Sequence, residues 1–199
     1  MTATNPHTIE SALQALKHGN HRFASKWSLH SSQDPALLDH LAVHGQAPLA
    51  AILGCSDSRV PIEMVFDQGF GDLFVVRVAG NILGEEETGS LEYAVEHLGV
   101  PLVVVLGHTH CGAVSAAIKG AEETGALGCL LERLRPAVQA VADLPDDQKE
   151  LAAIKKNVEI SVSQLTSISP VLAEAVGQGR VKIIGAVYYL ENRHVVFDS

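Results

Sequence analysis

The sequence predicts a single α/β domain built on a mostly parallel β-sheet. Apolar runs alternate with helical patterns in the order strand–helix–strand–helix–strand, which is typical of a parallel sheet with crossover helices. The run over 100–106 is apolar at nearly every position, as in a strand covered on both faces. The length of 199 residues suits one domain over 1–199, and the chain shows no repeat, low-complexity tract or linker.

The first predicted elements are two helices. Thr8 can cap a helix whose apolar residues recur at helical spacing, namely Ile9, Leu13 and Leu16. This helix precedes the first strand and forms an N-terminal arm at about 1–26. In "SQDPALLDHLAVHG", Asp34 is the N-cap, Pro35 takes the first helical position and Gly45 lies past the end, which together define a second helix.

The remaining elements alternate as this fold class requires. In the middle of the chain we expect a strand over 47–55, a helical turn over 61–66, a strand over 72–80, a helix over 88–98 and a strand over 100–106. After these we expect helices beginning near Cys111, over 124–142, over 147–167 and at Pro170, and then a last strand with a hairpin turn at 191–193.

Composition narrows the possible partners and location. The formal net charge of −9 disfavours a nucleic-acid partner, because few basic groups would neutralise a phosphate backbone. No run approaches the roughly 20 apolar residues of a membrane-spanning helix, so we expect no membrane partner. Residues 1–26 are polar and lack an apolar signal core, which predicts a cytoplasmic protein. Two other possibilities stay open: that a leader was trimmed from the protein, and that the protein is located in a microcompartment.

The chain has three cysteines, Cys55, Cys111 and Cys129. An odd and sparse set is a poor disulfide framework, so each thiol is expected to be free. Three roles are then open for each one: core packing, a nucleophile or a metal ligand. Cys129 lies within a helical pattern and is expected to pack in the core.

Metal-binding residue types follow two of the predicted strands. Cys55 follows the first strand, and His108 and Cys111 follow the strand over 100–106. Open α/β sheets bind ligands beyond the carboxyl ends of their strands, so neighbouring strands would bring these side chains together. Two thiolates and an imidazole suit tetrahedral Zn²⁺. His110 is expected to be an exposed loop residue rather than a ligand.

An acid and an arginine lie close to the first of these cysteines. Three protein ligands leave a fourth position for water or for a nearby carboxylate, and Asp57 is the nearest candidate. Arg59 can hold Asp57 away from the metal through a two-pronged, charge-assisted hydrogen bond. The pair would therefore control the fourth position. A closed structural zinc site is the main alternative, although no fourth Cys or His has suitable spacing.

The two motifs resemble a known family. "CSDSRVP" and "GHTHCGAV" are similar to the two zinc motifs of the β-class carbonic anhydrases, and "GNHRF", "GDLFVVRVAGN" and "GSLEYAVEHLGV" resemble family segments in the expected order. The resemblance covers roughly residues 8–197. It implies a four-stranded parallel sheet extended by a C-terminal strand, a homodimer or dimer of dimers, and zinc-dependent, reversible hydration of CO₂ to bicarbonate and a proton.

The resemblance also implies roles for individual residues. Zinc would be held by Cys55, His108 and Cys111, with Asp57 and Arg59 as the catalytic dyad and Asp57 as a fourth ligand only in a closed state. The substrate-binding residues would be Gln46, which hydrogen-bonds the substrate, Phe74 and Tyr93, aromatics often supplied across a dimer interface, and Val78, part of an apolar wall for CO₂. Gln46 could instead be a polar residue at a helix exit, and the two aromatics could serve only in packing.

Two other functions stay open. Some relatives of this fold hydrolyse carbon disulfide or carbonyl sulfide at the same metal site. A catalytically silent zinc domain used for assembly is a third hypothesis, but it would predict the loss of Asp57 or Arg59, and both are present.

The sequence departs from part of the family at a second, non-catalytic bicarbonate pocket. That pocket uses a tryptophan, an arginine and a tyrosine. Here Ile52 takes the tryptophan's position and the single tryptophan is Trp27, whereas Arg77 matches the arginine and Tyr188 the tyrosine. We therefore expect weak binding there and an open site near pH 7.5, with the carboxylate of the dyad on its arginine. From its place inside a strand, Arg77 is expected to pair with an acid.

Overall fold

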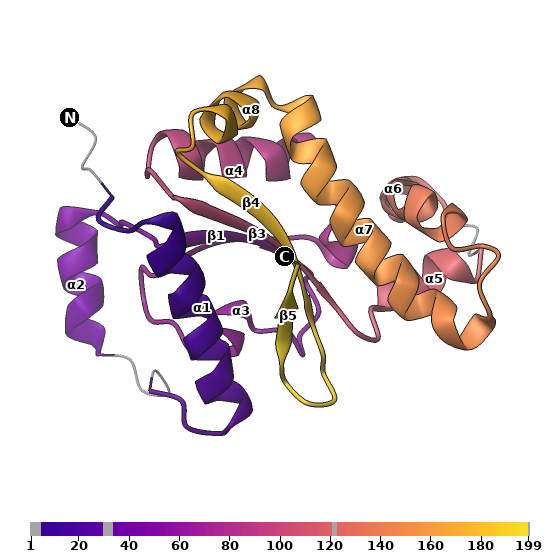
Figure 1. Cartoon of the computed structure of the whole chain (residues 1–199), viewed down its shortest axis with the longest axis horizontal. Coiled ribbons are helices and arrows are strands. Elements are labelled where there is room, and N and C mark those ends of the chain that lie inside the picture. Colours follow the sequence, from indigo (N-terminus) through magenta and orange to yellow (C-terminus); the bar gives the residue numbers. More distant parts are fainter. Residues whose placement is uncertain (1–4, 30–33, 121–122, 199) are drawn as a thin grey trace.

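The computed structural model describes residues 5–29, 34–120 and 123–198, and its centre is a five-stranded sheet in the order β2-β1-β3-β4-β5 (Figure 1). Four strands are parallel, and the last is antiparallel to its neighbour. They are β1 (Ala50–Gly54), β2 (Leu73–Arg77), β3 (Leu102–His108), β4 (Lys182–Tyr188) and β5 (Val195–Phe197). The predicted fold class is confirmed.

Helices cover both faces of this sheet, because successive residues of each strand point to opposite sides. Ala51 and Leu53 face one core cluster, while Ala50 and Ile52 face the other. The helices on the Ala50 side are α1 (Ile9–Ala24) and α3 (Ile62–Val65). On the Ala51 side lie α4 (Glu85–Glu96), α5 (Gly112–Ile118), α6 (Gly125–Gln139), α7 (Asp146–Ile168) and α8 (Pro170–Gly177) (Figure 1). None of the described helices is long and apolar enough to span a bilayer.

Helix α1 packs on its own sheet. Thr8 caps it as predicted, but Ala12 and Leu16 are fully buried in the core shared with α3. The approach is close, since a Cβ atom on Gly19 would lie 1.7 Å from the carbonyl oxygen of Phe66. The apolar stripe of the predicted arm thus packs against the chain's own core. Residues 1–4 of the arm lie outside the described residues.

Helix α2 (Pro35–His44) forms as its capping residues predict but buries none of its side chains. The Asp34 carboxylate accepts from the Ala36 N–H, and Gly45 takes φ of 81° past the helix end. Its exposed apolar residues are Leu37, Leu38 and Val43. Figure 1 shows α2 at the margin of the molecule. The apolar side chains of α2 are therefore part of neither core cluster.

Several boundaries differ from the sequence prediction, and three of them change how the site is described. Strand β2 ends at Arg77, because a 3₁₀ turn follows over 79–81 in which Gly80 has φ of 72°. Strand β3 extends through His108, so this histidine belongs to the strand rather than to the loop. Helix α4 begins at Glu85, where three consecutive glutamates stabilise the helix N-terminus.

The C-terminal hairpin is fixed to distant parts of the chain. The amide of Asn20 on α1 donates to the carbonyl oxygens of Val65 (3.1 Å) and Arg193 (2.9 Å), and accepts from the Val195 N–H (2.8 Å). The Thr109 N–H after β3 donates to the Tyr188 carbonyl at the end of β4. The last part of α1 and the C-terminal hairpin therefore meet near the carboxyl ends of the strands.

Candidate metal centre

Three ligand atoms converge where β1 and β3 end. Cys55 follows β1, His108 is the last residue of β3, and Cys111 is the N-cap of α5. Because β1 and β3 are parallel neighbours, with Gly54 opposite Leu106, their carboxyl ends lie side by side. The two sulfurs and the imidazole lie within 4.8 Å of one another, and all three residues are buried. This is the grouping that the sequence predicts.

The state of the histidine fits a metal ligand. His108 Nδ1 lies 2.9 Å from the Thr109 carbonyl oxygen, so Nδ1 carries the hydrogen of the neutral ring and donates it. Nε2 is buried and has no hydrogen-bond partner among the described residues. A buried, unpartnered nitrogen facing two thiols, with the other ring nitrogen held by a carbonyl, is typical of a zinc-binding histidine.

The thiols also fit a metal. The Gly80 N–H donates to Cys55 Sγ at 3.2 Å. The pKa of Cys55 falls to about 4, mainly because Cys111 donates a hydrogen bond to its thiolate. The same hydrogen bond and burial raise the pKa of Cys111. A metal ion bound between the two sulfurs would displace protons from them.

The acid of the predicted dyad is held by its arginine. Asp57 Oδ1 accepts from the backbone N–H and Nε of Arg59, both at 2.9 Å, and Oδ2 accepts from Nη2 at 2.7 Å. The arginine lowers the pKa of Asp57 to about 2. Oδ2 also lies 3.9 Å from His108 Nε2. The carboxylate therefore borders the ligand group while both of its oxygens are bound to Arg59.

A second arginine supports the same loop, and sequence reasoning missed this role. Arg77 Nε donates to the Cys55 carbonyl oxygen at 2.9 Å, and Nη2 donates to that of Asp57 at 2.7 Å. Both contacts are with carbonyls of its own chain rather than with an acid, and pairing with an acid across an interface stays a prediction. No signal in the sequence indicates this role, because it depends on the strand register that places Arg77 opposite Gly54 at the end of the neighbouring strand.

The predicted substrate residues are not gathered within one chain. The Val78 N–H donates to the Gly54 carbonyl oxygen, which places Val78 at the same sheet edge as the ligands. The rings of Phe74 and the half-exposed Tyr93 lie 6.2 Å apart between their centroids. This pair lies nearer the amino-terminal ends of the parallel strands. Gln46 is exposed and precedes β1, whereas the ligand Cys55 follows it. Gln46 thus lies at the opposite end of this strand.

The positions matching the second bicarbonate pocket are engaged elsewhere. Ile52 and Tyr188 are buried in the core cluster beneath α1. Trp27 lies past the end of α1 and is exposed, and Arg77 grips the backbone of the Cys55 loop. The expectation of weak bicarbonate binding stays a prediction.

Two further predictions concern side chains near the surface. The side chain of His110 is 58 % exposed and outside the ligand group, as predicted. Cys129 on α6 is exposed, so its predicted place in the core is wrong. The helical pattern around Cys129 was read correctly, but this residue lies on the outer face of the helix.

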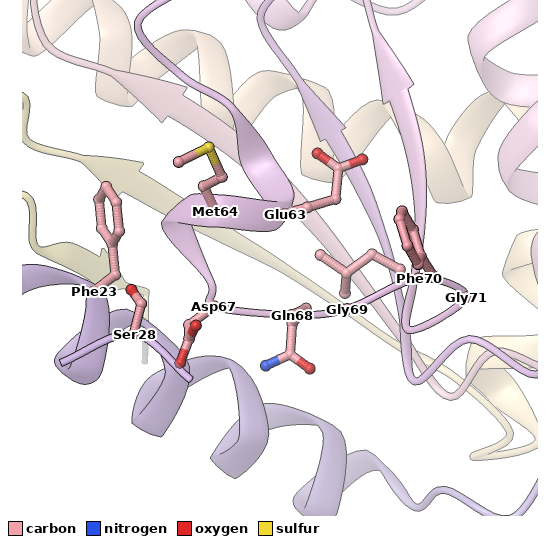
Figure 2. Close-up of a pocket in the computed structure, with 10 residues that line it drawn as sticks. Phe23, Ser28, Glu63, Met64, Asp67, Gln68, Gly69, Phe70 and Gly71 are labelled. Carbon is pink, nitrogen blue, oxygen red and sulfur yellow. The ribbon is translucent and has the colours of Figure 1, made fainter. Parts of the chain in front are cut away.

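A separate cavity of about 460 Å³ lies between the end of α1, α3 and the segment leading into β2 (Figure 2). Figure 2 shows Phe23, Met64 and Phe70 from these three segments around it. The residues that line it are Phe23, Ser28, Glu63, Met64, Asp67, Gln68, Gly69, Phe70, Gly71 and Leu73. None of the metal-ligand or dyad residues is among them. This cavity is therefore separate from the candidate metal centre.

Comparison with known proteins agrees with this arrangement. A family model described as "Carbonic anhydrase" matches residues 50–195. "Carbonic anhydrase 2" of Mycobacterium tuberculosis is 40 % identical over 206 residues, covering 98 % of this chain and 94 % of that protein. The carbonic anhydrase of Mycolicibacterium smegmatis is 38 % identical over 197 residues, covering 95 % and 93 %.

Solved structures share the fold. A chain from the crystal structures of two tetrameric β-carbonic anhydrases of Sordaria macrospora has a TM-score of 0.75 at 26 % identity, covering 94 % of this chain and 95 % of that one. A β-carbonic anhydrase of Aspergillus fumigatus has a TM-score of 0.74 at 31 % identity, covering 94 % and 90 %. With a family match over most of its length and these neighbours in structure, the chain is an enzyme of the carbonic anhydrase family, in its β class.

Proposed function

We propose that this enzyme hydrates CO₂ reversibly to bicarbonate and a proton, with zinc held by Cys55, His108 and Cys111. The observation that carries the proposal is the buried Cys–His–Cys group, with an arginine-bound carboxylate at its border. When bound, zinc would supply the Lewis-acid chemistry that activates water for attack on CO₂. The two thiolates would balance the charge of the divalent ion, and the imidazole would complete the protein ligands.

In this proposal the dyad orients the attacking water. Arg59 keeps Asp57 ionised, so the carboxylate can only accept hydrogen bonds. An acceptor fixed at this position would direct the water hydrogen toward itself and a lone pair toward carbon. Arg59 also occupies both carboxylate oxygens, which opposes direct binding of Asp57 to the metal. Val78 would add an apolar wall suited to nonpolar CO₂.

The enzyme is further proposed to work as a homodimer or a dimer of dimers. The three exposed apolar residues of α2 support self-association, and the Sordaria macrospora neighbours are described as tetrameric. Gln46 follows α2 directly and is remote from Cys55 of its own chain. A second copy would therefore bring Gln46, together with Phe74 and Tyr93, to the substrate. The free cysteines support a reducing, cytoplasmic location.

The decisive experiment measures CO₂ hydration by stopped flow on zinc-loaded protein, alongside hydrogen sulfide release from carbon disulfide. Asp57→Ala and Arg59→Ala are expected to keep one zinc per chain and to lose at least ~100-fold in kcat. Asp146→Ala, which removes an exposed carboxylate paired with Lys149, is the control and is expected to match the parent.

Two results would contradict the proposal. Full hydration rates in both dyad variants would remove the assigned roles of Asp57 and Arg59. Sulfide release from carbon disulfide without CO₂ hydration would instead make the chain a hydrolase of the sulfur compounds.

A further inference from the structure

We propose that Glu191, in the turn between β4 and β5, is a positioning residue for the reaction. It fixes the loop between two metal ligands so that the carbonyl of His110 can hold Arg59 against Asp57. The inference rests on the proposed function, because it acts through the role assigned there to Arg59. It concerns a residue 80 positions away from the nearest ligand in the sequence, Cys111.

Glu191 contacts two consecutive residues, Thr109 and His110, in the loop between the proposed ligands His108 and Cys111. We call this segment the ligand loop. Glu191 Oε2 accepts from the Thr109 hydroxyl at 3.0 Å, and Glu191 Oε1 accepts from His110 Nε2 at 2.6 Å. The neighbouring Leu190 N–H donates to the same Thr109 oxygen at 3.0 Å. Because Thr109 and His110 lie between the proposed ligands His108 and Cys111, these contacts fix the ligand loop to the hairpin turn. None of them involves a ligand atom.

The ligand loop has an unfavourable backbone conformation at His110. His110 has φ of 57°, in the left-handed region that non-glycine residues rarely adopt. Such a conformation persists only where the surroundings hold it, and it commonly occurs at functional sites. The contact with Glu191 restrains the His110 side chain. Without it, the His110 side chain loses its closest restraint, and the backbone of His110 can relax more easily toward an ordinary conformation.

The direction of the His110 carbonyl matters because that oxygen accepts from Arg59 Nη2 at 2.9 Å. The same Nη2 donates to Asp57 Oδ2 at 2.7 Å. One nitrogen therefore links the carbonyl of the ligand loop to the carboxylate of the dyad. A carbonyl that turns away would leave Arg59 fixed only by Asp57 itself, and the pair would then be able to rotate as a unit.

Other groups near His110 cannot replace Glu191. Glu150 Oε2 lies 3.6 Å from His110 Nδ1, which is too long for a hydrogen bond, and the other oxygen of Glu150 accepts from the Ser115 hydroxyl. The Glu191 side chain is 54 % exposed, so its contacts contribute little to global stability. Its effect should therefore appear in the reaction rather than in the melting temperature.

A double-mutant cycle tests the inference. Glu191→Ala is expected to lower kcat about tenfold to 150-fold, as for one lost hydrogen bond to a charged group, with unchanged zinc content and little change in KM. Glu191→Gln keeps the length and one acceptor oxygen and is expected to recover part of this loss. In an Arg59→Ala background, Glu191→Ala should cause no further loss, because its effect passes through Arg59.

The matched control is Asn192→Ala in the same turn. Asn192 Oδ1 accepts from the His194 N–H, and among the described residues its side chain makes no hydrogen bond to the ligand loop, so this variant loosens the turn alone. It should keep the parent kcat. A second measurement does not depend on activity: side-chain ¹⁵N NMR should show faster rotation of the Arg59 guanidinium in Glu191→Ala and parent-like rotation in Asn192→Ala.

The outcomes separate the two proposals. If the parent protein releases sulfide from carbon disulfide without hydrating CO₂, the proposed function fails; if Arg59→Ala is fully active in hydration, only the proposed role of Arg59 fails. If Arg59→Ala is impaired but Glu191→Ala has the parent kcat, or if the two losses multiply, the role of Glu191 is overturned. Unchanged Arg59 rotation in Glu191→Ala, or an equal kcat loss in Asn192→Ala, would overturn it as well.

Discussion

Replacing Arg77 with lysine is expected to weaken zinc binding. The guanidinium donates from two nitrogens to the carbonyls of Cys55 and Asp57, at 2.9 and 2.7 Å. Lysine keeps the charge but presents one nitrogen on a flexible stem, so it cannot reproduce this fork. One lost hydrogen bond from a charged donor costs about 1.5–3 kcal/mol. Loss of a group that orients a metal ligand commonly lowers metal affinity about 10- to 100-fold, which is of the same size.

Competition with a chromogenic chelator would measure this change directly. The zinc dissociation constant of Arg77→Lys should rise by the factor above, while circular dichroism should report the parent fold. Arg180→Lys is the control, because Arg180 also makes two side-chain contacts, to Gln178 and Glu96, but on the surface away from the ligands. A zinc dissociation constant in Arg77→Lys equal to that of the parent would refute the supporting role of Arg77.

Three further predictions concern the metal, the hairpin and the assembly. Cys111→Ala should lose most of its zinc, measured by elemental analysis, because two side chains make a poor tetrahedral site; stoichiometric zinc in this variant would remove the ligand assignment. Asn20→Ala should lower the free energy of unfolding by about 2–5 kcal/mol, because it leaves three backbone groups of α3 and the hairpin without their partner. Urea titration would measure this loss. A loss below about 1 kcal/mol, the contribution of one ordinary hydrogen bond, would show that water replaces the amide. Glutamine at the three exposed apolar positions of α2 should reduce the assembly mass in light scattering, and an unchanged mass would place the interface elsewhere.

The metal ligands could be predicted from sequence because their signal is local. Each ligand lies at the end of an apolar run, and parallel strands bring such ends together whatever the details of packing. The dyad could be predicted for a similar reason, since Asp57 and Arg59 are two residues apart.

The supporting residues could not be predicted because their partners are remote in the sequence. The contact between Thr109 and Glu191 spans 82 residues and depends on how the hairpin turns after β4. The grip of Arg77 depends on the register of β2 against β1. No composition or periodicity rule reports such contacts. In the same way, the stripe on α1 indicated an apolar contact but not whether the contact lay within the chain or with a second copy.

The position of the hairpin has a consequence for synthesis of the protein. All three proposed zinc ligands leave the ribosome well before residues 189–198, which form the hairpin turn and β5. A nascent or C-terminally clipped chain would therefore contain a complete set of ligands but lack Glu191 and the partners of Asn20 in the hairpin. The proposed ligands and their support from the hairpin would thus be synthesised at different times, so the ligand loop would gain its restraint only after the hairpin has formed.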